Sequence, residues 1–238
     1  MRIRWLGQVP YAEAWDLQRA IATRSEADYV LLLEHPPVYT LGVNADLGHV
    51  LVDPQTLGAD LVRVDRGGDV TFHGPGQLVG YPIVSVGEGP HRGTEHVRRI
   101  EQVIIDVLVE LGLRRDDVGR LPGYPGVWVG LDRDATGAAE GVLGTRKICA
   151  IGVRTARGRT THGFALNVDP DLAFFGHIVP CGIADRPVTS LAAEGWTGTM
   201  ADVVEAVVQV ARRQWDPDAD FQAVIDRRAP APQVGTPG

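Results

Sequence analysis

Asp28-Tyr29-Val30-Leu31-Leu32-Leu33-Glu34 holds an unbroken apolar run of strand length. Such a run is typical of a strand that is buried on both faces, because none of its positions alternates toward water. The clearest helical pattern lies over Thr94 to Leu111 and is ended by Gly112. Its apolar residues follow the i, i+3, i+4, i+7 spacing of one helix face: Val97, Ile100, Ile104, Val107, Leu108 and Leu111. Together the two patterns predict a fold that contains both strands and helices.

The rest of the chain also mixes strand and helix patterns, without strict alternation and without an internal repeat. Further strands are predicted over Arg2 to Leu6, Asp60 to Val64, Gln77 to Val84, Gly126 to Val129, Lys147 to Arg154 and Thr160 to Val168. Further helices are predicted over Tyr11 to Arg24, Thr199 to Arg213 and Phe221 to Arg228. We therefore predict one α+β domain with a mixed sheet over residues 1–228. The three prolines in residues 229–238 predict a loose tail, and the small, polar segment 131–144 a hairpin loop.

Composition excludes several classes of protein. The 238 residues are 44% hydrophobic and carry a net charge of −7, which argues against a general nucleic-acid binder. One of the local basic runs, such as Arg98-Arg99, Arg114-Arg115 or Arg154 to Arg159, can meet an acidic protein partner. Residues 1–10 lack the apolar part of a secretory signal, and no apolar stretch approaches the roughly 20 residues that span a bilayer. We expect a cytoplasmic protein with reduced thiols and no metal site.

A glycine-rich segment, Arg66-Gly-Gly-Asp-Val-Thr-Phe-His-Gly-Pro-Gly-Gln77, is the first candidate for chemistry. Five of its twelve residues are Gly or Pro, which suits a backbone placed close to a ligand. It matches neither the dinucleotide fingerprint nor the phosphate loop of nucleotide-binding proteins. A tight structural turn is the alternative, but the interleaved Arg, Thr, His and Gln residues favour a binding loop.

Lys147 is the only lysine in the chain, since the other 22 of the 23 basic residues are arginine. It opens the alternating strand Lys147-Ile-Cys-Ala-Ile-Gly-Val153. A lysine amine can lose its proton where a guanidinium cannot, so this position suits a base. The alternatives are a composition bias and an edge lysine whose ammonium lies in water. Cys149, within the same strand, is predicted to be a small core residue.

Two more segments carry candidate residues. In Thr160-Thr-His-Gly-Phe-Ala-Leu-Asn167, Gly163 and Ala165 either leave room for a ligand against the strand or allow two elements to pack closely. His162 is predicted to be a structural hydrogen bonder. Cys181 lies between Pro180 and Gly182, in a turn that can present its thiol to a cleft; the alternative is a buried packing cysteine.

These four segments, Arg66 to Gln77, Lys147 to Gly152, His162 to Asn167 and Pro180 to Gly182, occur together and in order. In this they resemble the octanoyl-[acyl-carrier-protein]:protein N-octanoyltransferases, the lipoyl (octanoyl) transferases of lipoic acid biosynthesis. The resemblance extends from Leu32 to Leu191. It implies a mixed, largely antiparallel sheet flanked by helices, shared with the catalytic domains of biotin and lipoate protein ligases.

The resemblance also implies an activity and its residues. An octanoyl group would pass from acyl carrier protein to a lysine of a lipoyl domain, in the E2 subunits of 2-oxo acid dehydrogenases or in the glycine cleavage H protein. No cofactor and a monomer are expected. Cys181 would hold the acyl thioester, and Lys147 would activate it. The acyl site would be lined by Arg66, Gly67, Gly68, Asp69, Val70, Thr71, Phe72, His73, Ala150, Ile151, Gly152, Gly163, Phe164 and Ala165.

These residue types suit that chemistry. Exchange of one thioester for another needs no ATP, in keeping with the missing nucleotide motifs. A nearby ammonium stabilises a thiolate, and a lysine can then act as a base toward the incoming amine. Three other functions remain open: an ATP-dependent lipoate or biotin ligase of the same fold, a non-catalytic acyl-binding protein, and a thiol hydrolase that passes the acyl group to water.

Overall fold

The computed structural model describes residues 1–131, 144–179 and 186–223. Its strands are β1 (Arg2–Gln8), β2 (Tyr29–Glu34), β3 (Val38–Leu41), β4 (Asp60–Arg63), β5 (Val70–His73), β6 (Gln77–Ile83), β7 (Val118–Leu121), β8 (Tyr124–Val129), β9 (Arg146–Ala156), β10 (Arg159–Asn167) and β11 (Asp220–Ala223). Its helices are α1 (Tyr11–Arg24), α2 (Arg92–Glu110) and α4 (Met200–Gln214), with short 3₁₀ helices η1 (Leu47–His49), η2 (Pro54–Leu57) and η3 (Leu172–His177).

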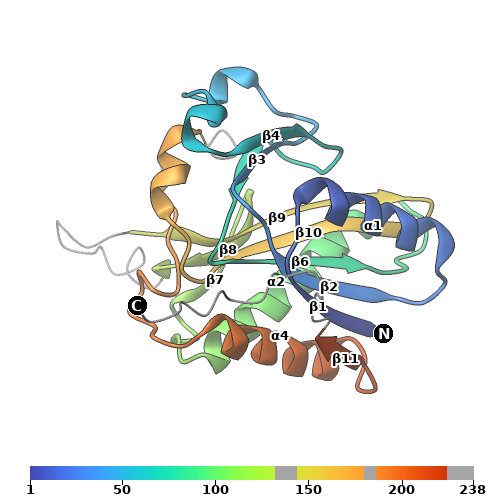
Figure 1. Ribbon diagram of the computed structural model, residues 1–238. Helices are drawn as coiled ribbons and strands as arrows, with labels where there is room; N and C mark the ends of the chain where they lie inside the picture. Colours follow the sequence, from blue (N-terminus) through green and yellow to red (C-terminus); the bar gives the residue numbers. More distant parts are fainter. Residues whose placement is uncertain (132–143, 180–185, 224–238) are drawn as a thin grey trace, which may run out of the picture.

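A central sheet of eight strands has the order β11-β1-β2-β6-β10-β9-β8-β7 (Figure 1). β1 pairs in parallel with β11 and β2, and all the other neighbours are antiparallel. A second sheet, β4-β3-β5, lies above the first in Figure 1. The predicted α+β fold with a mixed, largely antiparallel sheet is therefore confirmed.

Helices cover both faces of the central sheet. α2 and α4 pack together on one face, and α1 lies on the other (Figure 1). The apolar run of β2 serves both layers: Val30 and Leu32 join the core under α2 and α4, whereas Leu31 and Leu33 join the core under α1. The prediction that this strand is buried on both faces is thus confirmed.

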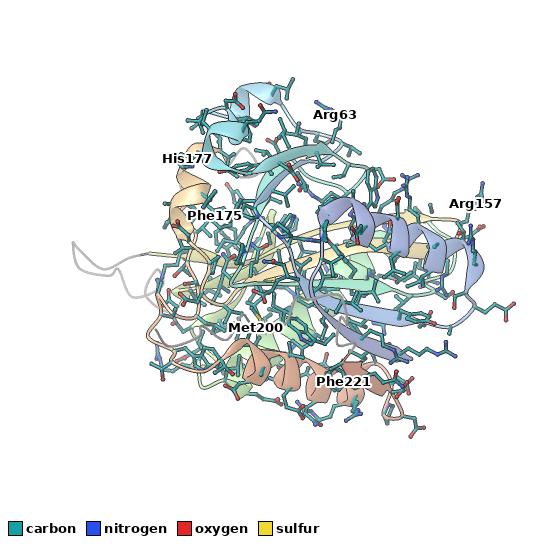
Figure 2. All side chains as sticks on the ribbon, viewed as in Figure 1. Arg63, Arg157, Phe175, His177, Met200 and Phe221 are labelled. Atoms are coloured by element: carbon teal, nitrogen blue, oxygen red, sulfur yellow. The ribbon has the colours of Figure 1, made fainter. Side chains whose placement is uncertain are left out.

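The small sheet has its own apolar cluster. Tyr39 of β3 and Phe72 of β5 pack against Phe175 of η3, which is labelled beside that sheet in Figure 2. Phe72 stacks on Phe174 with ring centroids 4.5 Å apart. The cluster holds the small sheet to the segment that follows β10.

Three of the predicted helices match the structure within two or three residues. Tyr11 to Arg24 is α1, and α2 and α4 occupy the other two predicted ranges. Thr199 caps α4, and its side chain and that of Asp202 exchange hydrogen bonds with each other's backbone N–H. Such capping boxes are local, which is why the sequence could indicate this one.

The fourth predicted helix, Phe221 to Arg228, is wrong over its described residues. Residues 221–223 belong to β11, where Phe221 is the register partner of Ile3. Phe221 packs against the main core and lies next to α4 in Figure 2. The exposed edge of β1 offers hydrogen-bonding groups along its length, and pairing with it outweighs the weak helical pattern of this short segment. Residues 224–228 lie outside the described part of the chain.

The sequence patterns did not indicate β3, β5 or β7. Each has four residues, a length at which an alternating pattern is weak, although β4, of the same length, was indicated. β5 lies inside the glycine-rich segment that was predicted to be a binding loop. Apart from residues 131 and 144, the predicted hairpin loop at 131–144 and the tail at 229–238 fall outside the described residues. No helix in the described ranges is both long and apolar enough to cross a membrane.

Candidate active site

Two of the predicted site segments are neighbours in the central sheet. In the pairing of β9 with β10, Ala150 is the register partner of Ala165, Ile151 of Phe164, and Gly152 of Gly163. The antiparallel register thus joins segments that are more than ten residues apart in the chain. Arg157, labelled in Figure 2, lies at the turn between the two strands, at the opposite end of β9 from Lys147.

The third segment is tied to the same strands. The backbone N–H of Gly67 donates to the carbonyl of Val153 at 3.1 Å. The Arg66 side chain is buried and donates to the carbonyl of Thr40 at 2.7 Å and to its hydroxyl at 2.8 Å. These bonds hold the start of the glycine-rich segment against β9 and β3.

One pocket brings most of the predicted residues together. Eleven of the fourteen line it: Arg66, Gly67, Gly68, Thr71, His73, Ala150, Ile151, Gly152, Gly163, Phe164 and Ala165. We call it the acyl pocket. Tyr11, Val79, Tyr81 and His162 complete its lining. Sequence reasoning missed Tyr11, Val79 and Tyr81 as site residues, because each looks like an ordinary core residue of its own helix or strand.

The other three predicted residues do not line this pocket. Successive side chains of a strand point to opposite faces. On β5, Thr71 and His73 therefore face the pocket, while Val70 and Phe72 face the core of the small sheet. Asp69 faces the neighbouring cavity described below and pairs with His49.

Gly163 and Gly152 are required for close packing as well as for the pocket. A Cβ added to Gly163 would lie 2.1 Å from the carbonyl oxygen of Gly80, the backbone of the adjacent strand. One added to Gly152 would lie 2.9 Å from the carbonyl oxygen of Gly67. Of the two alternatives that the sequence left open, close packing applies at Gly163, which also lines the acyl pocket.

A chain of buried polar side chains forms part of the pocket wall. Nδ1 of His35 lies 2.6 Å from the Val9 carbonyl oxygen, and Nε2 lies 2.7 Å from the Tyr81 hydroxyl. Because the carbonyl only accepts, Nδ1 of His35 carries a proton, and Nε2 of the neutral ring accepts from Tyr81. Tyr81 is hydrogen-bonded to Tyr11, whose hydroxyl lies 3.4 Å from Nδ1 of His162.

His162 is the outer end of this chain. Its Nε2 lies 2.7 Å from Oδ1 of Asp65, which also pairs with Arg154. Burial, with the charges of Arg66 and Arg154, lowers the pKa of His162 to about 3. Burial likewise lowers the pKa of His35 to about 4 and raises that of Tyr11 to about 12. His35, Tyr11 and His162 are therefore uncharged near neutral pH, and His162 is the structural hydrogen bonder that the sequence indicated.

Lys147 stands at the start of β9, beside the acyl pocket. Its side chain is only 9% exposed, so the alternative of an edge lysine with its ammonium in water is wrong. Nζ donates to the carbonyl of Pro125 at 3.2 Å and lies 4.7 Å from the centroid of the Trp128 ring. Both contacts stabilise a cation, the second through the negative face of the indole.

Lys147 lines a second cavity, which we call the lysine cavity. This cavity shares Gly67, Gly68, Ile151 and Gly152 with the acyl pocket. The pocket and the cavity are therefore adjacent, and these four residues lie at the boundary between them.

Cys149 is fully buried, and burial raises its pKa well above the usual range for a thiol. This confirms it as a core residue, as predicted. Cys181 lies outside the described residues. The described residues that follow it are tied to Lys147: the backbone N–H of Lys147 donates to the carbonyl of Pro187, and that of Thr189 donates to the carbonyl of Lys147, both at 2.9 Å. No cluster of metal-ligating side chains is found in the parts of the chain that the structure covers.

Comparisons with known proteins place the chain in a family. The family model of the lipoyl protein ligase A/B catalytic domain matches residues 10–212. An octanoyltransferase of Mycolicibacterium gilvum is 47% identical over 211 residues, 87% of this chain and 82% of that protein. One of Gloeobacter violaceus is 46% identical over 210 residues, 86% of this chain and 85% of that protein. The chain belongs to the octanoyltransferase family.

The fold of this octanoyltransferase is also found among solved structures. A lipoate protein ligase of Thermoplasma acidophilum aligns with a TM-score of 0.69 over 94% of this chain and 87% of that chain. The two sequences are 17% identical, so this likeness concerns the fold alone. It agrees with the implied relation to the ligase catalytic domains.

Proposed function

We propose that this octanoyltransferase takes its acyl group from octanoyl-acyl carrier protein and passes it, through a thioester on Cys181, to a lysine of lipoyl domains. The acceptors would be the E2 subunits of 2-oxo acid dehydrogenases and the glycine cleavage H protein, in the cytoplasm. The observation that carries the proposal is that the acyl pocket and the lysine cavity are adjacent. They share four lining residues.

The strand beside the acyl pocket is long enough to accompany a medium chain. His162 lines the pocket, and its register partner Val153 is six residues along β9 from Lys147. Six residues of strand span about 20 Å. An extended eight-carbon chain is about 9 Å long with C–C bonds of about 1.5 Å. The remainder leaves room for the Lys147 side chain and the thioester.

The walls of the pocket suit the same ligand. Ala150, Ile151, Phe164 and Ala165 present apolar surface, and the small residues keep the space narrow. Burying an alkyl chain stabilises the complex by about 0.8 kcal/mol for each methylene group. The neutral His162 ring lines the pocket farther along β10 from Lys147 than Gly163 to Ala165 do.

Lys147 is proposed to act twice. In the first step, its ammonium stabilises the Cys181 thiolate, which attacks the donor thioester. The carrier leaves as a thiol after taking a proton from Lys147, which becomes a neutral amine. In the second step, the amine of the acceptor lysine attacks the Cys181 thioester and loses a proton to Lys147, while the Cys181 thiolate leaves. The product is an amide, so the second step is downhill without ATP.

The described contacts support a place for Cys181 near Lys147. Pro187 lies six positions after Cys181, and its carbonyl accepts a hydrogen bond from the backbone N–H of Lys147. On the other side, the backbone N–H of Val179, two residues before Cys181, donates to the carbonyl of His49, next to the loop that borders the lysine cavity. The described residues on either side of Cys181 thus support a place for its thiol at this cavity.

Intact-mass spectrometry tests the proposal. Wild-type protein mixed with octanoyl-acyl carrier protein is expected to gain one octanoyl group, which a lipoyl domain then removes. Cys181→Ser should gain no labile adduct, whereas Cys149→Ser, the matched control in the core, should be acylated like the wild type. An adduct that survives in Cys181→Ser would refute the assignment.

The same experiment separates the other three functions. Release of free octanoate with no acylated lipoyl domain would indicate a hydrolase. Transfer of free octanoate that depends on ATP would indicate a ligase, and tight binding without any adduct would indicate a non-catalytic acyl-binding protein. Size-exclusion chromatography of the same sample checks the expected monomer.

A further inference from the structure

A third cavity continues from the lysine cavity. It lies between α2 and the turn that joins β7 to β8, and it shares Val97, Gly123, Tyr124 and Pro125 with the lysine cavity. It shares no residue with the acyl pocket. The three spaces are therefore arranged in series, with the lysine cavity in the middle and the third cavity on the side away from the acyl chain.

A buried carboxylate and an arginine give the third cavity a fixed shape. Glu101 of α2 is 5% exposed and accepts from the Gly126 backbone N–H at 3.1 Å and from Nε of Arg120 at 2.8 Å. Nη2 of Arg120 donates onward to the carbonyl of Arg98 at 2.9 Å. These bonds tie the β7–β8 hairpin to α2, and the two opposite charges of Glu101 and Arg120 balance.

Arg98 adds a positive charge at this cavity that no described carboxylate pairs with. Its side chain is exposed and lines the cavity. Among the described residues, its guanidinium takes part in no hydrogen bond or ion pair. Arg99, the next residue, lies over the Trp215 ring instead, at 5.9 Å from the centroid. The opposite wall of the cavity is apolar, formed by Leu121, Pro122, Tyr124 and Pro125.

We propose that the third cavity binds the phosphopantetheine arm of the donor, with Arg98 at its phosphodiester. The inference rests on the proposed function, in which the donor is an acyl carrier protein. From the thioester outward, the arm has two amides, a branched apolar group and a phosphate. The protein presents groups in the matching order: Lys147 at the reacting end, then Tyr124 and the prolines, then Arg98. Guanidinium groups bind phosphate oxygens with strong, charge-assisted hydrogen bonds.

The acceptor lysine fits this cavity less well than the donor arm does. Its ammonium would meet the positive charge of Arg98, and its short side chain has no apolar branch for Pro122 and Tyr124. The cavity thereby separates the two substrates, since it receives the anionic, elongated donor and repels the cationic acceptor. The sequence indicated the Arg98-Arg99 pair as a candidate contact for an acidic partner. In this proposal the two residues differ: Arg98 binds the donor, and Arg99 packs on Trp215.

Three donors test the proposal in the Arg98→Glu variant: octanoyl-acyl carrier protein, octanoyl-phosphopantetheine and octanoyl-pantetheine, which lacks the phosphate. The rate of Cys181 acylation per donor concentration should fall about tenfold or more with the first two donors, as expected for loss of a charge-assisted bond. It should stay within about twofold with octanoyl-pantetheine. Arg99→Glu, the matched control, should resemble the wild type with all three.

The outcomes are distinct. An equal loss with octanoyl-pantetheine, or no loss with octanoyl-phosphopantetheine, would overturn the assignment; a loss confined to the whole carrier protein would mean that Arg98 meets the carrier surface instead. Transfer from the octanoylated variant to a lipoyl domain should be unchanged, because the arm has left by then. If the wild type is acylated by none of the three donors, the proposed function itself fails.

Discussion

The Nζ of Lys147 lies 4.7 Å from the centroid of the Trp128 ring, its cross-strand partner between β9 and β8. Trp128 is 1% exposed, and its indole N–H donates to the Tyr124 carbonyl at 3.0 Å. The only lysine of the chain is thus held over a fixed aromatic face at the boundary between the acyl pocket and the third cavity. Its position follows from the register of two strands.

Substituting Lys147 should separate the two steps of transfer. Lys147→Arg keeps a cation for the thiolate but cannot accept a proton, so we expect Cys181 to be acylated and the discharge onto a lipoyl domain to slow by about 10² or more. Single-turnover intact-mass kinetics measures both steps. Lys147→Met, the control without charge, should be slow in both. If Lys147→Arg discharged its acyl group at the wild-type rate, the role of Lys147 as a base would be contradicted.

Ala165 should set the length of the acyl chain. Its side chain is 4% exposed and lines the acyl pocket, so Ala165→Leu fills space that the chain would occupy. The preferred donor should shift from octanoyl toward hexanoyl, with a loss of roughly tenfold for octanoyl if two methylene groups are displaced. Competition among six-, eight- and ten-carbon donors measures the shift. Ala156→Leu, at the exposed end of β9, is the control; a shift there, or none in Ala165→Leu, would contradict the prediction.

Phe72 should matter for stability and little for the acyl chain. It is 1% exposed and packs on Tyr39, Phe174 and Phe175, on the face of β5 opposite to the pocket. We expect Phe72→Ala to lower the free energy of unfolding by about 3–5 kcal/mol. The folded fraction should keep its kcat/KM within about threefold. A raised KM at unchanged stability in urea unfolding would show that Phe72 lines the acyl site after all.

Three buried histidines should make the protein less stable in acid. Burial lowers the pKa values of His35 and His96 to about 4 and of His162 to about 3, below the unfolded value near 6.5. Between pH 6.5 and 4, the unfolded chain therefore binds more protons than the folded one, and the free energy of unfolding falls as the pH falls. Urea unfolding across this range measures the slope.

His96 offers a clean variant for this effect. It is 2% exposed, and neither ring nitrogen has a hydrogen-bond partner within the described residues. His96→Leu should change stability by less than about 1 kcal/mol at pH 7.5 and should exceed the wild type by on the order of 1–3 kcal/mol near pH 4. If the free energy of unfolding of His96→Leu fell with pH as steeply as that of the wild type, His96 would not contribute to the loss of stability in acid.

Local patterns predicted the elements whose signals are complete within a few residues. The run from Val30 to Leu33 indicated a strand buried on both faces, and Thr199 with Asp202 indicated a helix start. The helix predicted at Phe221 failed because pairing with β1, more than 200 residues away, decides that segment. Short strands such as β5 were missed because a period is weak over four residues, although β4 was indicated at the same length.

The site divides in the same way. The sequence by itself determined which residue types can do the chemistry: one lysine among 22 arginines, and small residues at Ala150, Gly152, Gly163 and Ala165. Only the tertiary structure decided which of them meet. The register of β9 with β10 turned two separate segments into one wall, and the alternation of β5 sent Thr71 toward the pocket and Phe72 away from it.

Tyr11 and Tyr81 line the acyl pocket, and Arg98 lines a cavity next to that of Lys147. Both results follow because helices and strands far apart in the chain pack on one sheet. Side-chain chemistry is a property of each residue, and a sequence states it directly. Proximity depends on strand order, register and helix packing, which are set by the free energy of the whole fold and not by any one segment.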